Sequence, residues 1–380
     1  MREKPNRSAT LGRMSKTGRI RVDCIVGARP NFMKMAPVLA EIRRRGDFAP
    51  RLIHTGQHFS PEMSDAFFRE LEMPEPDVNL EVGGGTATAQ TAEIMRRLEP
   101  LFAGDRPAAV LVVGDVTSTM AAAVAAIQQQ IPVAHVEAGL RSFDRRMPEE
   151  LNRILTDSIS SFLFVTEPSG VRNLRAEGVA DERIHLVGNV MIDTLMRFRE
   201  KAARSGILET LGVRPRAYAV VTLHRPSNVD DPAQLRKLHG ALVEVSRLLP
   251  VVFPVHPRTK ARLAEQSAEE APGLKLIPPL GYLDFLRLMA EARLVLTDSG
   301  GIQEETTVLQ VPCLTLRENT ERPVTVEQGT NRLIGVDPAA IVDAAKQSLA
   351  APAGAARIPE KWDGQAAGRI LDVLAGALTS

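Results

Sequence analysis

The sequence predicts an α/β fold built from two Rossmann-like domains, each with a parallel sheet. Short apolar runs rich in Val and Ile alternate with longer segments of helical periodicity. This alternation is typical of parallel strands joined by helical crossovers. A chain of 380 residues also exceeds one ordinary hydrophobic core, which favours two domains.

The expected elements follow one another regularly along the chain. In the first half we expect strands at 21–27, 49–56, 108–115, 131–137, 161–167 and 183–189. Between them we expect helices at 33–45, 61–71, 87–102, 120–130, 149–159 and 168–178. The pattern then restarts, with strands at 217–224, 250–256, 273–280, 293–299 and 311–318.

The two halves also echo each other. "AAVLVVGDVTST" and "IPVAHVEAG" in the first half match "ARLVLTDSGGIQEE" and "VPCLTLREN" in the second. Each set has a strand, an Asp, small residues that open a helix, and a Pro-started strand that ends in Glu. Such a repeat predicts two similar nucleotide-binding halves on either side of a central cleft.

The domain boundaries follow from local composition. Residues 1–20 are basic and lack periodicity, which is typical of a disordered tail or a cloning remnant. We expect domains at 21–190 and 191–363, joined by a helical linker within 188–206. A final amphipathic helix at 364–380 can pack on either half, including back on the N-terminal domain.

Composition narrows the class of protein. The formal net charge of +1 gives no support to a nucleic-acid or membrane-surface role. Cys24 and Cys313 each lie in an apolar run, as in a reduced cytoplasmic protein. No apolar stretch approaches the roughly 20 residues that span a bilayer.

Polar residues follow many of the predicted strands. Ligands bind beyond the carboxyl ends of strands in open parallel sheets, although loop composition alone would supply some polar residues there. The residues in these positions are Arg29, Gln57, His58, Asp115, Glu137, His224, His256 and Asp298.

Residues 298–305, "DSGGIQEE", form the best candidate for an anion site. Ser299, Gly300 and Gly301 open a helix whose free amides and dipole attract phosphate. A carboxylate one turn later, at Glu304 or Glu305, could clasp ribose hydroxyls. An ordinary capped helix explains the motif equally well, and neither a dinucleotide fingerprint nor a P-loop is present.

Other motifs carry weaker signals. Asp115 in "GDVTST" is more simply a helix cap, and His54 with His58 straddle a turn, which makes a metal site improbable. His224 with Arg225 at a strand end favours function. The charged stretches at 134–153 and 317–323 fit either salt-bridged surface loops or a site that handles protons and phosphates.

Together these pieces resemble the UDP-N-acetylglucosamine 2-epimerase family. The shared motifs are "GARPNFMKMAPV", "TGQH", "GDVTST", "HVEAGLRS", "PEELNR", "VGNVMID", "LHRPSN", "PVHP", "TDSGGIQEE", "RENTERP" and "GTN". They run in order from about residue 22 to residue 335. The resemblance implies the glycosyltransferase-B architecture, with UDP bound by the second domain, and a cytoplasmic homodimer.

The family reaction inverts C2 of a UDP-linked N-acetyl sugar without a nicotinamide or any other cofactor. UDP is eliminated to leave a 2-acetamidoglucal, and it then adds back with a proton delivered to the other face. Carried over by position, the catalytic residues are Asp115, Glu137, Glu149 and His224. The implied substrate-binding residues are Arg29, Lys34, Arg153, His256, Ser299, Gly300, Gly301, Glu305 and Arg322. No metal is implied.

Three departures from the family pattern bear on substrate and regulation. Pro226 and Ser227 replace an Arg–Glu pair, and Ser60 and Ala89 replace residues of a regulatory second substrate site. These departures argue against regulation by a second UDP-sugar and favour a variant substrate or a hydrolysing member. From the resemblance as a whole we expect a non-hydrolysing 2-epimerase for UDP-GlcNAc or a modified UDP-sugar that supplies a polysaccharide. The alternatives are a hydrolysing 2-epimerase that releases N-acetylmannosamine, a glycosyltransferase on the same fold and a non-catalytic UDP-sugar sensor.

Overall fold

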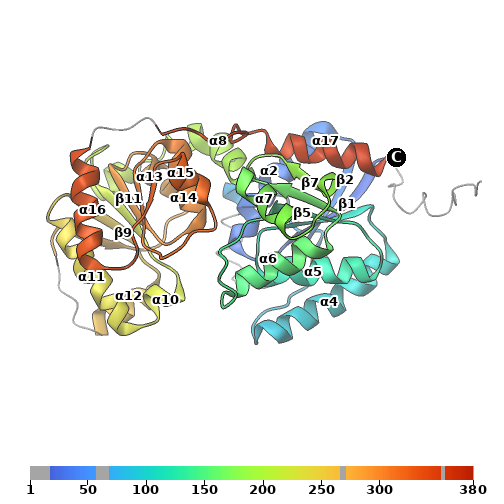
Figure 1. The fold of residues 1–380 in the computed structure, drawn as a ribbon, viewed down its shortest axis with the longest axis horizontal. Helices are drawn as coiled ribbons and strands as arrows, with labels where there is room; N and C mark the ends of the chain where they lie inside the picture. The colour runs from blue at the N-terminus through green and yellow to red at the C-terminus, as the bar shows by residue number, and fades with distance from the viewer. Residues whose placement is uncertain (1–17, 57–67, 266–270, 352–355, 380) are drawn as a thin grey trace, which may run out of the picture. The chain divides into compact units, whose positions relative to one another are not determined.

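The structure, a computed structural model, describes residues 18–56, 68–265, 271–351 and 356–379. These residues form two compact units. Unit 1 holds the residues up to Thr194 and those from Glu360 onward, and unit 2 holds Leu195–Pro359. Each unit is a parallel sheet covered by helices (Figure 1).

Unit 1 contains a seven-stranded sheet in the order β3-β2-β1-β4-β5-β6-β7. All the strand pairs are parallel. The strands are β1 (Ile20–Val26), β2 (Phe48–His54), β3 (Val78–Asn79), β4 (Ala109–Val113), β5 (Val133–Ala138), β6 (Phe162–Val165) and β7 (Ile184–Leu186). The helices are α2 (Arg29–Arg45), α4 (Ala87–Gly104), α5 (Thr117–Gln128), α6 (Pro148–Ile159), α7 (Pro168–Ala176) and a 3-10 turn at Asp181–Arg183.

The C-terminal helix α17 (Ala366–Leu378) belongs to unit 1 and packs on α2. Asp193, in the first turn of α8 (Val190–Ala202), accepts hydrogen bonds from the amides of Ala366 and Ala367 at 3.1 and 2.7 Å. A carboxylate at a helix N-terminus satisfies free amides and favours the helix dipole. Asp193 therefore ties the C-terminal helix to unit 1 across 173 residues of sequence.

Unit 2 repeats the same strand order, β10-β9-β8-β11-β12-β13, with all pairs parallel. Its strands are β8 (Ala219–Thr222), β9 (Val251–Pro254), β10 (Leu274–Ile277), β11 (Leu294–Thr297), β12 (Cys313–Thr315) and β13 (Asn331–Leu333). Its helices are α9 (Ile207–Leu211), α10 (Pro226–Val229), α11 (Pro232–Ser246), α12 (Pro257–Glu265), α13 (Tyr282–Ala290), α14 (Gly300–Leu309), α15 (Pro323–Glu327) and α16 (Pro338–Ala350).

The predicted fold class, two parallel α/β sheets, is confirmed. Sequence reasoning missed β3 and β13, which are two and three residues long and too short to show a periodic pattern. Most of the helix expected at 61–71 lies outside the described residues. In both sheets the chain order reverses between two central strands, β1 and β4 in unit 1 and β8 and β11 in unit 2, and ligands bind beside such switch points.

Candidate functional site

The switch point of unit 1 holds a buried ion pair. Lys34 on α2 contacts Glu137 at the end of β5 through its ammonium group. The two side chains are only 8% and 5% exposed. A buried carboxylate of this kind is tolerable because its charge is paired.

The backbone around this pair is unusual. Glu137 has a φ of 74°, in the left-handed region that non-glycine residues avoid, and the pairing of β5 with β6 shifts register between Val136 and Ala138. Such irregularities redirect a side chain and concentrate at functional sites. At the end of β4, a Cβ on Gly114 would lie 2.8 Å from the Lys34 Nζ, so glycine leaves the room that the pair needs.

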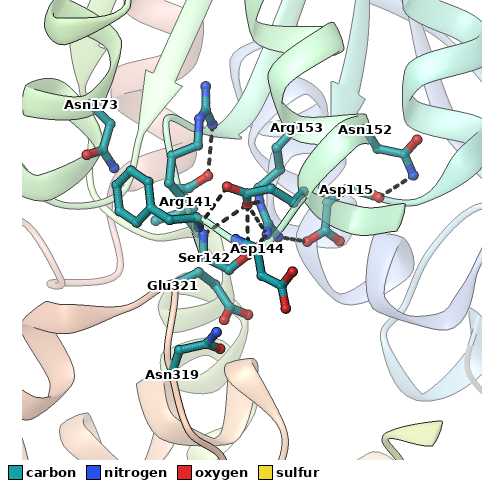
Figure 2. Close-up of polar contacts among 12 residues, drawn as sticks. Asp115, Arg141, Ser142, Asp144, Asn152, Arg153, Asn173, Asn319 and Glu321 are labelled. Atoms are coloured by element: carbon teal, nitrogen blue, oxygen red, sulfur yellow. Dashed lines mark hydrogen bonds and ion pairs between the residues drawn. The ribbon is translucent and has the colours of Figure 1, made fainter. Parts of the chain in front are cut away.

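A second ion pair lies next to the first. Arg153 on α6 binds Asp115, directly after β4, at 2.5 Å (Figure 2). The Asn152 side chain donates to the Asp115 carbonyl at 2.9 Å, so consecutive residues of α6 hold this turn. Asp115 is thus an ion-pair partner, and its expected role as a helix cap is wrong, because Val116 is the N-cap of α5 and no side chain caps this helix.

The adjacent carboxylates Glu149 and Glu150 differ in their surroundings. Glu150 is buried and accepts hydrogen bonds from the amides of Ser142 and Phe143, both at 2.9 Å, and from Arg153 at 2.6 Å. Glu150 therefore does more than start the helix, because it holds the 142–143 loop against Arg153. Glu149 is half-buried in the first turn of α6.

The outer part of the same charged stretch is a surface loop. Asp144 and Arg146 are joined by a hydrogen-bonded ion pair at 2.8 Å in which Arg146 is almost fully exposed. Ion pairs of this kind contribute little to stability. The solvated-loop reading of 134–153 thus holds for Asp144 and Arg146 and fails for the residues nearer the strands.

Sequence reasoning missed a buried network behind these carboxylates. Asp157 on α6 contacts His135 and Arg141, each at 2.7 Å, and Arg141 also contacts Glu177 at 2.6 Å. His135 and Arg141 were visible only as parts of the quoted motif "HVEAGLRS". Nothing in the local pattern around Asp157 separated it from an ordinary polar residue in the last turn of a helix.

In unit 2, Asp298 joins the ends of β8 and β11. It is fully buried and accepts hydrogen bonds from the amides of His224 and Arg225 at 3.1 and 3.0 Å, and from the Asn228 side chain at 3.1 Å. The His224 ring contacts it through Nδ1 at 2.8 Å and is itself 60% exposed. Burial raises the pKa of Asp298, but the bonds from His224, Arg225 and Asn228 outweigh burial and lower it.

The backbone at the start of α14 is suited to the anion site that the sequence predicts there. Ser299 makes no side-chain cap for this helix, and its amide donates to Thr297 Oγ1 at 2.9 Å. A Cβ on Gly300 would collide with the Arg322 guanidinium, so this arginine lies against the first turn. Gly301 follows in the same turn. Helix amides with a nearby guanidinium form a suitable environment for a phosphate.

The two carboxylates of α14 are not equivalent. Arg322 forms an ion pair with Glu304 at 2.8 Å, whereas Glu305 accepts a hydrogen bond from the Tyr282 hydroxyl at 3.2 Å. Burial, followed by the nearby charge of Glu304, raises the pKa of Glu305 to about 8 despite that hydrogen bond. Glu305 therefore carries a proton at neutral pH.

The 317–323 loop is built into unit 2 rather than spread on its surface. Glu321 is buried and lies 2.8 Å from Arg317, 2.5 Å from Arg322 and 3.5 Å from Arg225. The buried side-chain oxygen of Gln303 on α14 accepts from Thr320 and Asn331 at 2.7 and 3.0 Å. This network explains why "RENTERP" and "GTN" accompany "SGGIQEE".

The structure gives few contacts for some predicted site residues and does not describe others. His256 is exposed after β9, and its carbonyl accepts from the Lys260 amide at 3.0 Å. Ala89 lies in the first turn of α4, where its amide donates to Thr86. The side chain of Arg29, and all of Gln57, His58 and Ser60, lie outside the described residues.

The structure brings several of the predicted residues together, in one group per unit. Lys34, Asp115, Glu137 and Arg153 meet in unit 1. His224 lies in unit 2 at the end of β8, beside β11 and the start of α14, where Ser299, Gly300 and Arg322 meet. In the described ranges no three or more His, Cys, Asp or Glu could hold a metal ion, and no helix there is long and apolar enough to cross a membrane.

Comparison with known proteins gives a consistent result. The family model described as UDP-N-acetylglucosamine 2-epimerase matches residues 40–375. A UDP-N-acetylglucosamine 2-epimerase of Methanococcus maripaludis is 41% identical over 87% of this chain and 92% of its own length. A UDP-2,3-diacetamido-2,3-dideoxy-D-glucuronate 2-epimerase of Pseudomonas aeruginosa is 41% identical over 86% of this chain and 91% of its own.

The fold comparison agrees with the sequence comparison. The crystal structure of Methanocaldococcus jannaschii UDP-GlcNAc 2-epimerase in complex with UDP-GlcNAc and UDP matches with a TM-score of 0.86 and 38% identity. The match covers 94% of this chain and all of that one. A second structure, from Neisseria meningitidis and bound to UDP-GlcNAc, matches with a TM-score of 0.83 and 29% identity.

Proposed function

Because this chain belongs to the UDP-N-acetylglucosamine 2-epimerase family, we propose that it is a non-hydrolysing 2-epimerase. It interconverts UDP-GlcNAc and UDP-ManNAc, or a modified pair of UDP-sugars such as the P. aeruginosa relative's name describes. The observation that carries the proposal is the pair of neighbouring ion pairs, Lys34–Glu137 and Arg153–Asp115, at the switch point of unit 1.

Inversion at C2 needs one group that removes a proton and another that delivers one to the opposite face. We assign this proton work to Glu137 and Glu149, with Asp115 holding or tuning them. Glu137 is fixed by Lys34 and by its strained backbone, whereas Glu149 is half-buried one turn from Arg153. Two carboxylates in unequal environments are suited to different roles in one reaction.

UDP must leave and return during the reaction, so its diphosphate needs stable electrostatic support. The hydroxyl of Ser299, the amides of Gly300 and Gly301, and the Arg322 guanidinium supply that support in unit 2. Protonated Glu305 can donate to a ribose hydroxyl as well as accept from one. Arg153 and Lys34 are the supporting cations of unit 1, and Arg29 and His256 complete the binding set.

His224 is the catalytic residue that we assign to unit 2. Asp298 contacts the Nδ1 of its ring at 2.8 Å while most of the ring stays exposed. A carboxylate in this position fixes the tautomer and the orientation of an imidazole, as in hydrolytic triads. We further propose that the protein acts as a cytoplasmic homodimer in polysaccharide biosynthesis.

Incubation with UDP-GlcNAc in D₂O, followed by NMR, tests the proposal. We expect deuterium at C2 of a mixture of two nucleotide-linked epimers. Release of free N-acetylmannosamine with UDP would instead establish the hydrolysing reaction. Transfer that requires an added acceptor would establish a glycosyltransferase, and no change would indicate another UDP-sugar or a sensor, which a panel of UDP-HexNAc substrates then separates.

A further inference from the structure

Asp157 lies at the centre of a network that touches both sides of Glu137. It sits in the last turn of α6 with its side chain 1% exposed. One oxygen contacts His135 Nδ1 at 2.7 Å. The other accepts the Gly139 amide at 3.0 Å and contacts Arg141 at 2.7 Å. Asp157 therefore binds the backbone two residues after Glu137 and a side chain two residues before it.

This bracketing coincides with the irregular part of β5. Glu137 has a positive φ, the register shifts between Val136 and Ala138, and Gly139 has a φ of 81°. A Cβ on Gly139 would lie 2.6 Å from the Gly170 carbonyl, so the strand end is also confined from α7. A strained backbone persists only where its surroundings over-determine it, and the Asp157–Gly139 bond is one such determinant.

His135 extends the network to the other candidate carboxylate. Its Nε2 lies 2.8 Å from the carbonyl of Gly114, the residue directly before Asp115. Its two ring nitrogens thus face a carbonyl and a carboxylate, so the ring links the end of β4 to Asp157. Asp157 therefore contacts the end of β5 directly and reaches the end of β4 through the His135 side chain.

The charges around Asp157 keep it ionised in a buried place. Burial raises the pKa of Asp157, but His135 and Arg141 outweigh burial and lower it. Arg141 is in turn held by Glu177, which is partly exposed. The carboxylate is thus enclosed by the His135 ring, the Arg141 guanidinium and the Gly139 amide, and a buried polar network whose bonds are all made is rigid.

We propose that Asp157 is a positioning residue that fixes the ends of β4 and β5 relative to each other, and with them Asp115 and Glu137. It reaches no substrate itself and acts through His135 and Gly139. The proposal rests on the proposed epimerase function, in which Glu137 shares the proton work with Glu149 and Asp115 holds or tunes them. A displacement of about 1 Å of a reacting group can cost about 10²-fold in rate.

The test compares Asp157→Ala and Asp157→Asn with the matched variant Asp23→Asn. Asp23, on β1 of the same unit, is an equally buried aspartate, and Arg51 binds it at 2.9 Å. We expect Asp157→Ala to lower kcat for C2 deuterium exchange by about 10²-fold with KM changed less than about threefold. Asp157→Asn, which keeps the shape, recovers part of that loss, and Asp23→Asn loses stability but keeps the wild-type kcat.

A wild-type kcat in folded Asp157→Ala would overturn the proposal, as would an equal loss in Asp23→Asn. Hydrogen–deuterium exchange of the backbone provides a readout that does not depend on the reaction. Segments 113–116 and 136–141 should exchange faster in Asp157→Ala and not in Asp23→Asn. Unchanged exchange there refutes the positioning role, whereas a wild-type protein that turns over no UDP-sugar refutes the proposed function instead.

Discussion

Two equivalent aspartates, at the ends of β4 and β11, have opposite surroundings. Asp115 is 24% exposed and pairs with Arg153. Asp298 is fully buried and binds two backbone amides, the Asn228 amide and the His224 ring. The sequence repeat places them at matching positions, but one aspartate is partly exposed while the other is part of the interior.

The neighbouring strand of each unit explains the difference. After β1, the side chain of Asn31 accepts from the amides of Gly27 and Ala28 at 3.2 and 3.1 Å and donates to the Val113 carbonyl at 2.8 Å. In unit 2 the corresponding loop is held by Asp298. Because an asparagine closes its own loop in unit 1, Asp115 is released to pair with Arg153. One duplicated plan thus yields an aspartate paired with an arginine in unit 1 and an aspartate that anchors a loop in unit 2.

Glu137→Gln is the variant with the largest expected effect on this comparison. If unit 1 carries the proton chemistry, kcat for C2 exchange should fall by about 10³-fold, within the range for a general acid or base. The dissociation constant for UDP should change less than about threefold, since unit 2 supplies the anchoring. Solvent exchange by NMR and calorimetry with UDP measure the two quantities.

Asp144→Asn is the control for Glu137→Gln, because it removes a carboxylate of the same loop region whose partner, Arg146, is on the surface. It should keep the wild-type rate. A Glu137→Gln variant that still exchanged the C2 hydrogen at the wild-type rate would contradict the proposal that unit 1 carries the proton chemistry and unit 2 anchors UDP.

Asp298→Asn tests the other side of the comparison. It weakens the bonds to three donors and should lower the free energy of unfolding by about 2 kcal/mol, as for hydrogen bonds to a charged group. Loss of the Nδ1 partner of His224 should also lower kcat by about 10-fold or more. Urea unfolding and steady-state kinetics measure these changes.

The pH dependence of that stability has a definite sign. Because the folded-state pKa of Asp298 lies below 3.8, its contribution is present above about pH 3.8 and is lost as the pH falls further. Asp298→Asn should not show this loss of stability at low pH. If the variant kept the wild-type stability and rate, Asp298 would be dispensable and the contrast with Asp115 would disappear.

The sequence predicted the repeated strand pattern because buried parallel strands leave continuous apolar runs. It also placed Asp115, Glu137 and Ser299 at strand ends, since that position depends only on order along the chain. It could not rank Glu149 against Glu150, because the loop that Glu150 clamps is defined only by tertiary contacts. Asp157 was missed for the same reason, as its partners come from β5 and the following loop.

Glu305→Gln should have the smallest effect at neutral pH, where Glu305 is already protonated and the amide is nearly isosteric. We expect the dissociation constant for UDP at pH 7 to change less than about threefold. The folded-state pKa of about 8 lies above the ordinary value of 4.5, so wild-type stability is full below pH 4.5 and falls as the pH rises toward 8.

The amide that replaces the carboxyl group in Glu305→Gln cannot ionise. The difference in free energy of unfolding, variant minus wild type, should therefore increase as the pH rises, by up to about 1.4 kcal/mol per pH unit. Urea unfolding at pH 5, 7 and 8.5 gives the slope. Equal slopes for both proteins would mean that Glu305 is ionised and paired in the fold, which would make it an anchored anion like Asp298. A steeper wild-type slope instead shows that the anchoring unit places a neutral acid beside its phosphate site, where a second anion would repel UDP.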